Sequence, residues 1–294
     1  MSVRARTRPA AAVRLRARVR GISAALFAAV LAACAHGAPR PAHAACGQVL
    51  FAGNSVIYTN NLPAIFVELA AAQDGGGACR ADLIARGGAT LSELEEDIAR
   101  QLASGTYSAL VLQEKGGSDL CVLDTQERAS AACQRLIASH VRLAEAARAH
   151  NVRVLYLGTY QFVPEASQAL VNAERELAYR MGARHIPLSE RLRAARGQQP
   201  ALPWLHADGS HPGLAASVLM AALVHKELAG SLPPSAALCS RIALYAPEWT
   251  PFPVTPHQVL TAPAAGRRCL LSDEQMRAVF DAAATAGTAP EPLQ

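Results

Sequence analysis

The sequence lacks three patterns that would each point to a particular class of protein. No C-x-x-C pair occurs among its seven cysteines, so it has no cysteine motif typical of a zinc site. No G-x-G-x-x-G or phosphate loop follows the first strand pattern, which leaves nucleotide binding without support. The apolar run at 22–33 has 12 residues, too few for a membrane-spanning helix, which needs about 20. We therefore expect neither a metal nor another cofactor.

Residues 1–45 have the pattern of an export leader. A basic stretch precedes the apolar run, as in secretory signal peptides, and its arginines are Arg4, Arg6, Arg8, Arg14, Arg16, Arg18 and Arg20. Leu31-Ala32-Ala33-Cys34 then resembles a bacterial lipobox, which would leave Cys34 lipidated and the protein anchored to a membrane. Ala42-His43-Ala44 resembles an A-x-A site, whose cleavage would release a soluble protein. We expect an exported protein, either an outer-membrane lipoprotein, which the lipobox slightly favours, or a periplasmic or secreted one.

The basic character of the chain belongs to this leader. The formal net charge is +5, and removing the seven leader arginines leaves −2 for a chain that starts at Cys34. A nucleic-acid partner is therefore not expected. The remaining chain, about 250 residues long, is long enough to bury the core of one α/β domain.

Six cysteines follow Cys34, an even number that favours disulfides in an exported protein. Their positions suggest pairing between nearest neighbours, since two of them precede the first two predicted strands and the others bracket loops. We predict bridges between Cys46 and Cys79, Cys121 and Cys133, and Cys239 and Cys269. The alternative is that they are buried free thiols.

Strand and helix patterns alternate from residue 48 to about 230. Apolar runs predict strands at 48–52, 82–85, 109–112, 152–157 and 183–188, and helical spacing predicts helices at 62–72, 90–103, 127–149, 165–181 and 214–228. This alternation predicts a three-layer α/β/α sandwich with a parallel five-stranded sheet in a domain at 46–232. The proline-rich residues 233–294 are expected to form an extension packed on that domain, with a helix at 272–284.

Glycine and polar motifs follow the predicted strands. Gly53-Asn54-Ser55 follows the first strand, Gly87-Gly88-Ala89-Thr90 the second and Leu112-Gln113-Glu114 the third. Asp208-Gly209-Ser210-His211 lies in a late loop, directly before Pro212-Gly213. Because ligands bind beyond the carboxyl ends of parallel strands, we expect these motifs to form one site.

Together the four motifs resemble the SGNH (GDSL-like) hydrolase superfamily over about residues 46–230. The resemblance implies a flavodoxin-like sandwich and hydrolysis of esters or acyl groups without a metal. Two positions depart from the usual pattern: Asn54 replaces the Asp of G-D-S, and Gln113 replaces the Asn of the third block. Gln also carries an amide N–H, but on a side chain one methylene longer.

The chemistry assigns a role to each motif. A serine hydroxyl needs a base to become nucleophilic, and His211 can remove the proton of Ser55 while Asp208 orients the imidazole. The negative charge that develops on the substrate needs donors. We expect these to be the backbone N–H groups of Ser55 and Gly88 and the side-chain amide of Gln113.

Three further residues are candidates for lining the substrate site: Asn54, Glu114 and Tyr160. Each has an ordinary structural alternative, as a turn residue, a supporting or solvated carboxylate, or a packed aromatic ring. His206 beside Asp208 and His211 could mimic a metal site, although no further ligand is evident.

These observations predict an exported serine esterase that acts on a small-molecule or polysaccharide ester. The resemblance to the superfamily favours acetyl groups on carbohydrate as the substrate, followed by lipid and aryl esters. The absence of a G-x-S-x-G elbow, with Ile57 at the second glycine position, argues against an α/β-hydrolase. The alternatives are a non-catalytic envelope binding protein on the same fold, motivated by Gln113 and Glu114, and a phosphodiesterase-like hydrolase.

Overall fold

A computed structural model describes residues 46–72, 79–232, 235–248 and 266–284 of the chain. All of them belong to one compact unit, Ala44–Gln294. The predictions for the leader, including Cys34 and both cleavage sites, lie outside the described residues. So do those for the prolines between 249 and 265.

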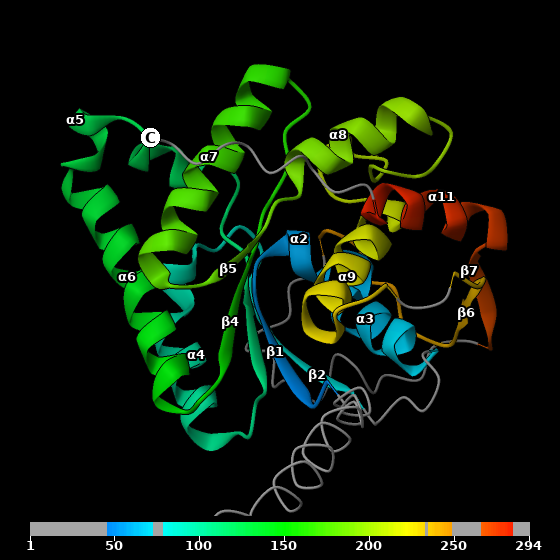
Figure 1. The fold of residues 1–294 in the computed structure, drawn as a ribbon, viewed down its shortest axis with the longest axis horizontal. Coiled ribbons are helices and arrows are strands. Elements are labelled where there is room, and N and C mark those ends of the chain that lie inside the picture. Colours follow the sequence, from blue (N-terminus) through cyan, green and yellow to red (C-terminus); the bar gives the residue numbers. More distant parts are fainter. Residues whose placement is uncertain (1–45, 73–78, 233–234, 249–265, 285–294) are drawn as a thin grey trace, which may run out of the picture. The chain divides into compact units, whose positions relative to one another are not determined.

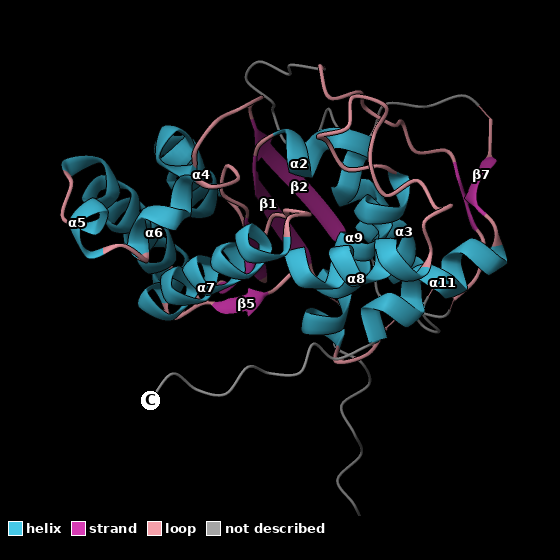
Figure 2. Ribbon diagram, turned by 90° about the horizontal axis from the view of Figure 1, so that it is seen from above, coloured by secondary structure: helices cyan, strands magenta, loops and turns pink. Residues whose placement is uncertain are grey.

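Five parallel strands form one sheet in the order β2-β1-β3-β4-β5 (Figures 1 and 2). They are β1 (Gln48–Gly53), β2 (Arg80–Ala85), β3 (Ala109–Leu112), β4 (Arg153–Leu157) and β5 (Arg184–Ile186). The predicted α/β class and parallel five-stranded sheet are confirmed. Because all five strands run the same way, their carboxyl ends meet at one edge of the sheet.

Side chains alternate along the interior strand β1 between two hydrophobic cores. Val49 and Phe51 pack into one core, and Leu50 and Ala52 pack into the other. Both faces of a parallel sheet are covered by crossover helices, so its strands are apolar on both sides. This explains why the strand at β1 is a continuous apolar run and shows no alternation with polar residues.

Helices cover both faces of the sheet (Figure 1). One core is completed by α3 (Leu62–Ala71), α8 (Ser189–Gln198), α9 (Leu214–Ala229) and α11 (Asp273–Ala284), and the other by α4 (Leu91–Ser104), α6 (Ala131–Ala149) and α7 (Pro164–Met181). Helix α9 is buried along most of its length, because it packs against both α3 and α11.

Several short elements were not predicted. The short ones are α2 (Ser55–Tyr58), η1 (Thr59–Asn61), η2 (Ser118–Val122) and α5 (Thr125–Arg128). Helix α8 and the antiparallel pair β6 (Leu238–Ser240) and β7 (Arg268–Leu271) were not predicted either. The helix expected at 127–149 is two helices, because the side chain of Ser130 accepts the N–H of Cys133 and caps a new start. Helix α8 was missed because only a few of its side chains are apolar and buried.

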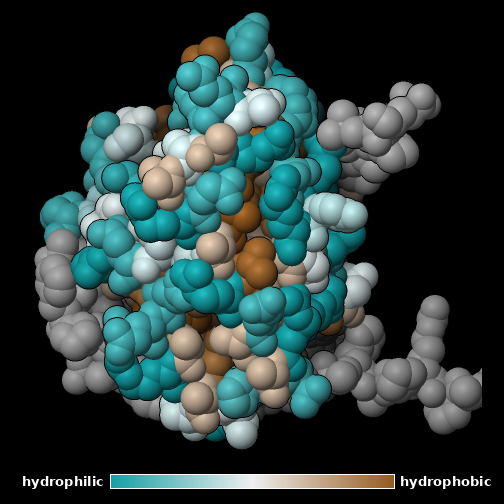
Figure 3. Space-filling view, turned by 90° about the vertical axis from the view of Figure 1, so that its left-hand side faces the viewer, coloured by the Kyte–Doolittle hydropathy of each residue, from teal (hydrophilic) through white to brown (hydrophobic). Residues whose placement is uncertain are grey.

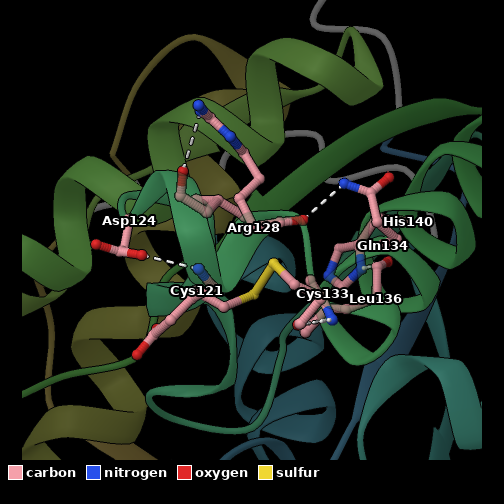
Figure 4. The surroundings of a disulfide bond; sticks show 10 residues. Cys121, Asp124, Arg128, Cys133, Gln134, Leu136 and His140 are labelled. Carbon is pink, nitrogen blue, oxygen red and sulfur yellow. Dashed lines mark hydrogen bonds between the residues drawn. A yellow bond between two sulfur atoms is a disulfide. The ribbon is translucent and has the colours of Figure 1, made fainter.

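The three predicted disulfides are confirmed. Cys46–Cys79 joins the starts of β1 and β2, and Cys239–Cys269 joins β6 to β7. Cys121–Cys133 ties η2 to the first turn of α6, next to the hydrogen bond between Gln134 and the carbonyl of Arg128 (Figure 4). Each bridge restricts the unfolded chain and so stabilises the fold.

Hydrophilic residues cover most of the face that carries α5 and α6, and hydrophobic ones show mainly in recesses between them (Figure 3). Within the described residues, none of the helices combines the length and the apolar character that crossing a membrane would require.

Candidate active site

The turn Gly53-Asn54-Ser55, here called the nucleophile turn, connects β1 to α2. Asn54 caps α2 by accepting the N–H of Val56 at 3.1 Å, and it donates to the carbonyl of Ala89 at 3.3 Å. A Cβ on Gly53 would lie 2.8 Å from the carbonyl oxygen of Gln113, so only glycine fits the close approach to β3. Ser55 is the first residue of α2 and is partly exposed.

The second half of the site is the histidine loop, residues 205–212. An isolated β-bridge between Leu205 and Pro212 closes it, and the N–H of His206 donates to the carbonyl of His211 at 2.9 Å. Gly209 supplies the turn with a φ of +74°. The loop is thus a small hairpin that presents Asp208 and His211 together.

The structure brings the nucleophile turn and the histidine loop into hydrogen-bond contact. His211 Nε2 lies 3.0 Å from Ser55 Oγ, and His211 Nδ1 lies 2.7 Å from Asp208 Oδ2. Because a carboxylate only accepts, Nδ1 carries the proton and Nε2 is left to accept from the serine hydroxyl. Residues 156 positions apart therefore form one Ser–His–Asp chain.

Asp208 is held in the ionised form. Its Oδ1 accepts the backbone N–H groups of His211 and Ser210, each at 2.9 Å. These bonds, followed by those from the side chains of His211 and His206, hold the pKa of Asp208 well below its usual range. The carboxylate can therefore orient His211 and stabilise its protonated form.

Two side chains support the histidine loop from neighbouring elements. Tyr160, after β4, donates its hydroxyl to the carbonyl of Ser210 at 2.7 Å and is 8% exposed. Asn60, in η1, donates to the carbonyl of Pro212 at 2.9 Å and to Ser217 Oγ at 3.0 Å. Tyr160 thus holds the loop and offers little surface to a substrate, and its role as a lining residue stays a prediction.

The expected third oxyanion donor is not available in this arrangement. Gln113 is 0% exposed, and its side-chain N–H already donates to the carbonyl of Glu114. Its Oε1 has no hydrogen-bond partner. The longer side chain folds back towards Gly53, so Gln113 does not present its amide N–H to an oxyanion in this arrangement.

The other proposed donor, Gly88, lies in the glycine turn, residues 87–90. Its φ is +67°, a conformation that favours glycine, and a Cβ there would meet open space. The glycine turn is exposed at Gly87 and Gly88 and buried at Ala89. The backbone of Gly88 is therefore accessible at the edge of the sheet where Ser55 lies.

Asn54 and Glu114 are both 3% exposed and so offer little surface to a substrate, and their role as lining residues stays a prediction. Asn54 holds the nucleophile turn as described above. Glu114 accepts the backbone N–H groups of Leu91 and Lys115.

His206 also contacts the carboxylate of Asp208, with Nδ1 at 3.2 Å from Oδ2. The sequence pattern drew attention to it only as a possible metal ligand. In the part of the chain that the structure describes, His, Cys, Asp and Glu side chains form no group of three or more that could hold a metal ion.

A three-layer α/β/α sandwich with Ser, His and Asp gathered beyond the strand ends is the arrangement that the SGNH resemblance implied. No family model matches this sequence, and no curated protein matches it at a significant level.

Solved structures do match. A DUF4886 family protein from Bacteroides uniformis is 14% identical, with a TM-score of 0.53 over 84% of this chain and 97% of that one. TesA is 23% identical, with a TM-score of 0.48 over 62% and 99% of the two chains. A catalytic mutant of Axe2, an acetylxylan esterase from Geobacillus stearothermophilus, is 13% identical, with a TM-score of 0.49 over 62% and 94%. The likeness to the DUF4886 family protein shows a shared fold and no more. The α/β fold expected from the resemblance is confirmed.

Proposed function

We propose that this protein is an exported serine esterase of the SGNH type, which hydrolyses a small acyl ester through an acyl-enzyme on Ser55. The observation that carries the proposal is the hydrogen-bonded chain from Ser55 through His211 to Asp208, with distances of 3.0 and 2.7 Å. Export is supported by the three disulfides, which persist in oxidising compartments, and by the leader.

Each step of the reaction uses a group already positioned. His211 Nε2 takes the hydroxyl proton while Ser55 Oγ attacks the ester carbonyl. The backbone N–H groups of Ser55 and Gly88 stabilise the oxyanion. The protonated His211 then gives its proton to the leaving alcohol, and a water activated by the same imidazole releases the acid.

An acetyl ester of a carbohydrate is the substrate we favour. The Ser–His–Asp chain lies at a partly exposed edge, where the side chains of His211 and Asp208 are 29% and 35% exposed. An ester that projects from a large polymer can reach such an edge without entering a deep pocket.

One observation favours a second candidate, a non-catalytic envelope binding protein on the same fold. Gln113 has its amide N–H occupied and cannot contribute a third oxyanion donor in this arrangement. A missing donor of this kind typically costs about 10²–10³ in kcat, which favours binding without efficient turnover.

Hydrolysis of p-nitrophenyl acetate separates the two candidates. Ser55→Ala should lower kcat on the order of 10⁴-fold or more, because the nucleophile is removed. Ser104→Ala is the matched control, since Ser104 is an exposed serine at the end of α4, shortly before the start of β3 and away from the carboxyl ends of the strands. Equal rates for wild type and Ser55→Ala would reject the esterase, and loss of activity on adding a chelator would favour a metal-dependent hydrolase.

A further inference from the structure

Glu114 is a buried carboxylate outside the Ser–His–Asp chain, and it joins two of the loops that surround Ser55. Its Oε2 accepts the N–H of Leu91 at 3.1 Å, and its Oε1 accepts the N–H of Lys115 at 2.7 Å. Leu91 is the first residue of α4, directly after the glycine turn, and Lys115 follows β3. A single side chain thus connects the backbone beyond β2 to the backbone beyond β3.

The glycine turn is held at two neighbouring points. Asn54 donates to the carbonyl of Ala89 at 3.3 Å, and Glu114 accepts from Leu91. Gly88 precedes both anchored residues and has a left-handed φ, so its own backbone imposes little restriction. Within the segment itself, the Ala89 N–H donates to the carbonyl of Arg86 at 3.1 Å, and Glu93 caps Thr90. The two anchors from other segments fix where this turn lies, and so influence the direction of the Gly88 N–H.

The surroundings of Glu114 bring two protonation states close in energy. Burial, with the acidic side chains nearby, raises the pKa of Glu114 to about 7, although the two backbone N–H groups oppose this shift. The titratable or charged groups around it are Glu93 on α4, Lys115 in its own loop, Asp119 on η2, His140 on α6, Tyr156 on β4 and Glu174 on α7.

His140 offers the proton of Glu114 an acceptor. Burial lowers the pKa of His140 to about 4, so the ring is neutral. Its Nδ1 lies 2.8 Å from the carbonyl of Leu136 and carries the proton, because a carbonyl only accepts. The bare Nε2 is buried without a hydrogen-bond partner, 3.4 Å from Glu114 Oε2. Figure 4 shows His140 on α6 near the disulfide Cys121–Cys133, which ties α6 to η2.

We propose that Glu114 is a positioning residue that holds the Gly88 oxyanion donor in place, and that a proton passing onto its Oε2 switches the hydrogen bond from Leu91 to His140. The ionised carboxylate accepts both backbone N–H groups. The protonated carboxyl donates from Oε2 to His140 Nε2, and its hold on the Leu91 N–H weakens. The inference rests on the proposed function, because it concerns an oxyanion donor.

The kinetic test compares Glu114→Gln with wild type on p-nitrophenyl acetate. Gln offers one acceptor oxygen where Glu uses two, so one backbone N–H loses its partner. We expect kcat to fall about 10- to 100-fold, as for a displaced catalytic donor, with KM changed far less. The acid limb of the wild-type kcat profile should contain two ionisations, and that of Glu114→Gln should contain one.

Glu174→Gln is the matched control. Glu174 is equally buried and also accepts a backbone N–H at a strand end, from Thr159 at 2.7 Å, but it does not contact the glycine turn. We expect this variant to keep kcat within about threefold and to keep both acid-limb ionisations. An equal loss of kcat in both variants would overturn the positioning role, as would an unchanged profile in Glu114→Gln.

Amide hydrogen exchange gives a readout that does not depend on turnover. Protection at Leu91 in wild type, corrected for the intrinsic rate, should decrease as pH falls through about 7, and in Glu114→Gln it should be low throughout. Should the variant not fold, the wild-type pH dependence decides alone, and constant protection would overturn the inference. If the wild type shows no Ser55-dependent turnover while Leu91 protection behaves as expected, the proposed function fails and the hydrogen-bond switch stands.

Discussion

Gln113 has the right chemistry for an oxyanion donor but the wrong position. Its amide is fully buried, its N–H is used by the carbonyl of Glu114, and its Oε1 is unsatisfied. A buried polar atom without a partner costs about 1–3 kcal/mol. The extra methylene lets the amide turn back into the protein beside Gly53, where it serves packing at a cost in stability.

Gln113→Leu tests this assignment. Leu has a similar volume and no polar atoms, so the unsatisfied oxygen disappears with the amide. We expect kcat within about threefold of wild type and a melting temperature equal or higher, because replacing an imperfectly paired polar group by an apolar one can be neutral or stabilising. Steady-state hydrolysis and thermal unfolding measure both, and a kcat loss of about 10² or more would restore Gln113 as an oxyanion donor.

The elements that meet at the active site are joined by polar contacts between distant parts of the chain. Asn60 in η1 binds the carbonyl of Pro212, 152 residues away, and its own N–H donates to the carbonyl of Tyr245 at 2.9 Å. It also has a φ of +60°. Asn60 thus links the segment that follows the nucleophile to the histidine loop and to the segment that contains Tyr245.

Two substitutions at Asn60 separate its side chain from its backbone. Asn60→Gly removes the bonds to Pro212 and Ser217 but tolerates the left-handed φ. Asn60→Ala removes the same bonds and, in addition, strains the backbone at this φ. We expect both variants to lower kcat by a similar factor of about 3- to 30-fold, because a loosened histidine loop misplaces the base. The alanine variant should also lose about 1 kcal/mol more of stability, measured by denaturant unfolding. Unchanged kcat in both would show that Asn60 does not position the loop.

The parts of the site that could be predicted from the sequence are those marked by a short motif of neighbouring residues. Gly53-Asn54-Ser55 and Asp208-Gly209-Ser210-His211 stand out because each follows a strand or lies in a glycine-flanked turn. The pairing of Cys46 with Cys79 was predicted because each precedes a strand, and the other two pairings because their cysteines bracket a loop. Asn60 and Glu114 act on backbone groups of other elements, and nothing in their own neighbourhood indicates those partners. Helix α8 was missed because it has too few buried apolar side chains to give a helical pattern in the sequence.

The molecule as a whole buries several titratable groups on one side of the sheet. Burial raises the pKa of Glu114 and Asp119 to about 7 and that of Glu174 to about 8. Burial also lowers the pKa of His140 to about 4 and that of His185 to about 3. These shifts favour the neutral form of all five side chains near pH 6.

Stability should consequently fall as pH rises from about 6.5 to 8. The three carboxyls hold protons in the folded state that the unfolded chain releases above about pH 4.5, so their contribution is lost as pH rises through 7 to 8. The two histidines act in the opposite direction, but only below their unfolded value of 6.5.

Calorimetry at about pH 6.5, 7.25 and 8 checks the predicted fall in stability. Each kcal/mol lost should lower the melting temperature by about 2–4 °C for a chain of this size. Glu174→Gln, which stays neutral, should show a shallower decline than wild type. A melting temperature that is constant or rises over this range would contradict the assignment of these groups as neutral.

The central claim, that Ser55 is a nucleophile activated by His211 and Asp208, is tested most directly by covalent labelling. The protein is treated with a fluorophosphonate, digested and mapped by mass spectrometry, with Ser55→Ala and Ser104→Ala treated in parallel. The account predicts one label per chain on the peptide that contains Ser55, present in Ser104→Ala and absent in Ser55→Ala. No labelling of the folded wild type, or a label on any other serine, would contradict it.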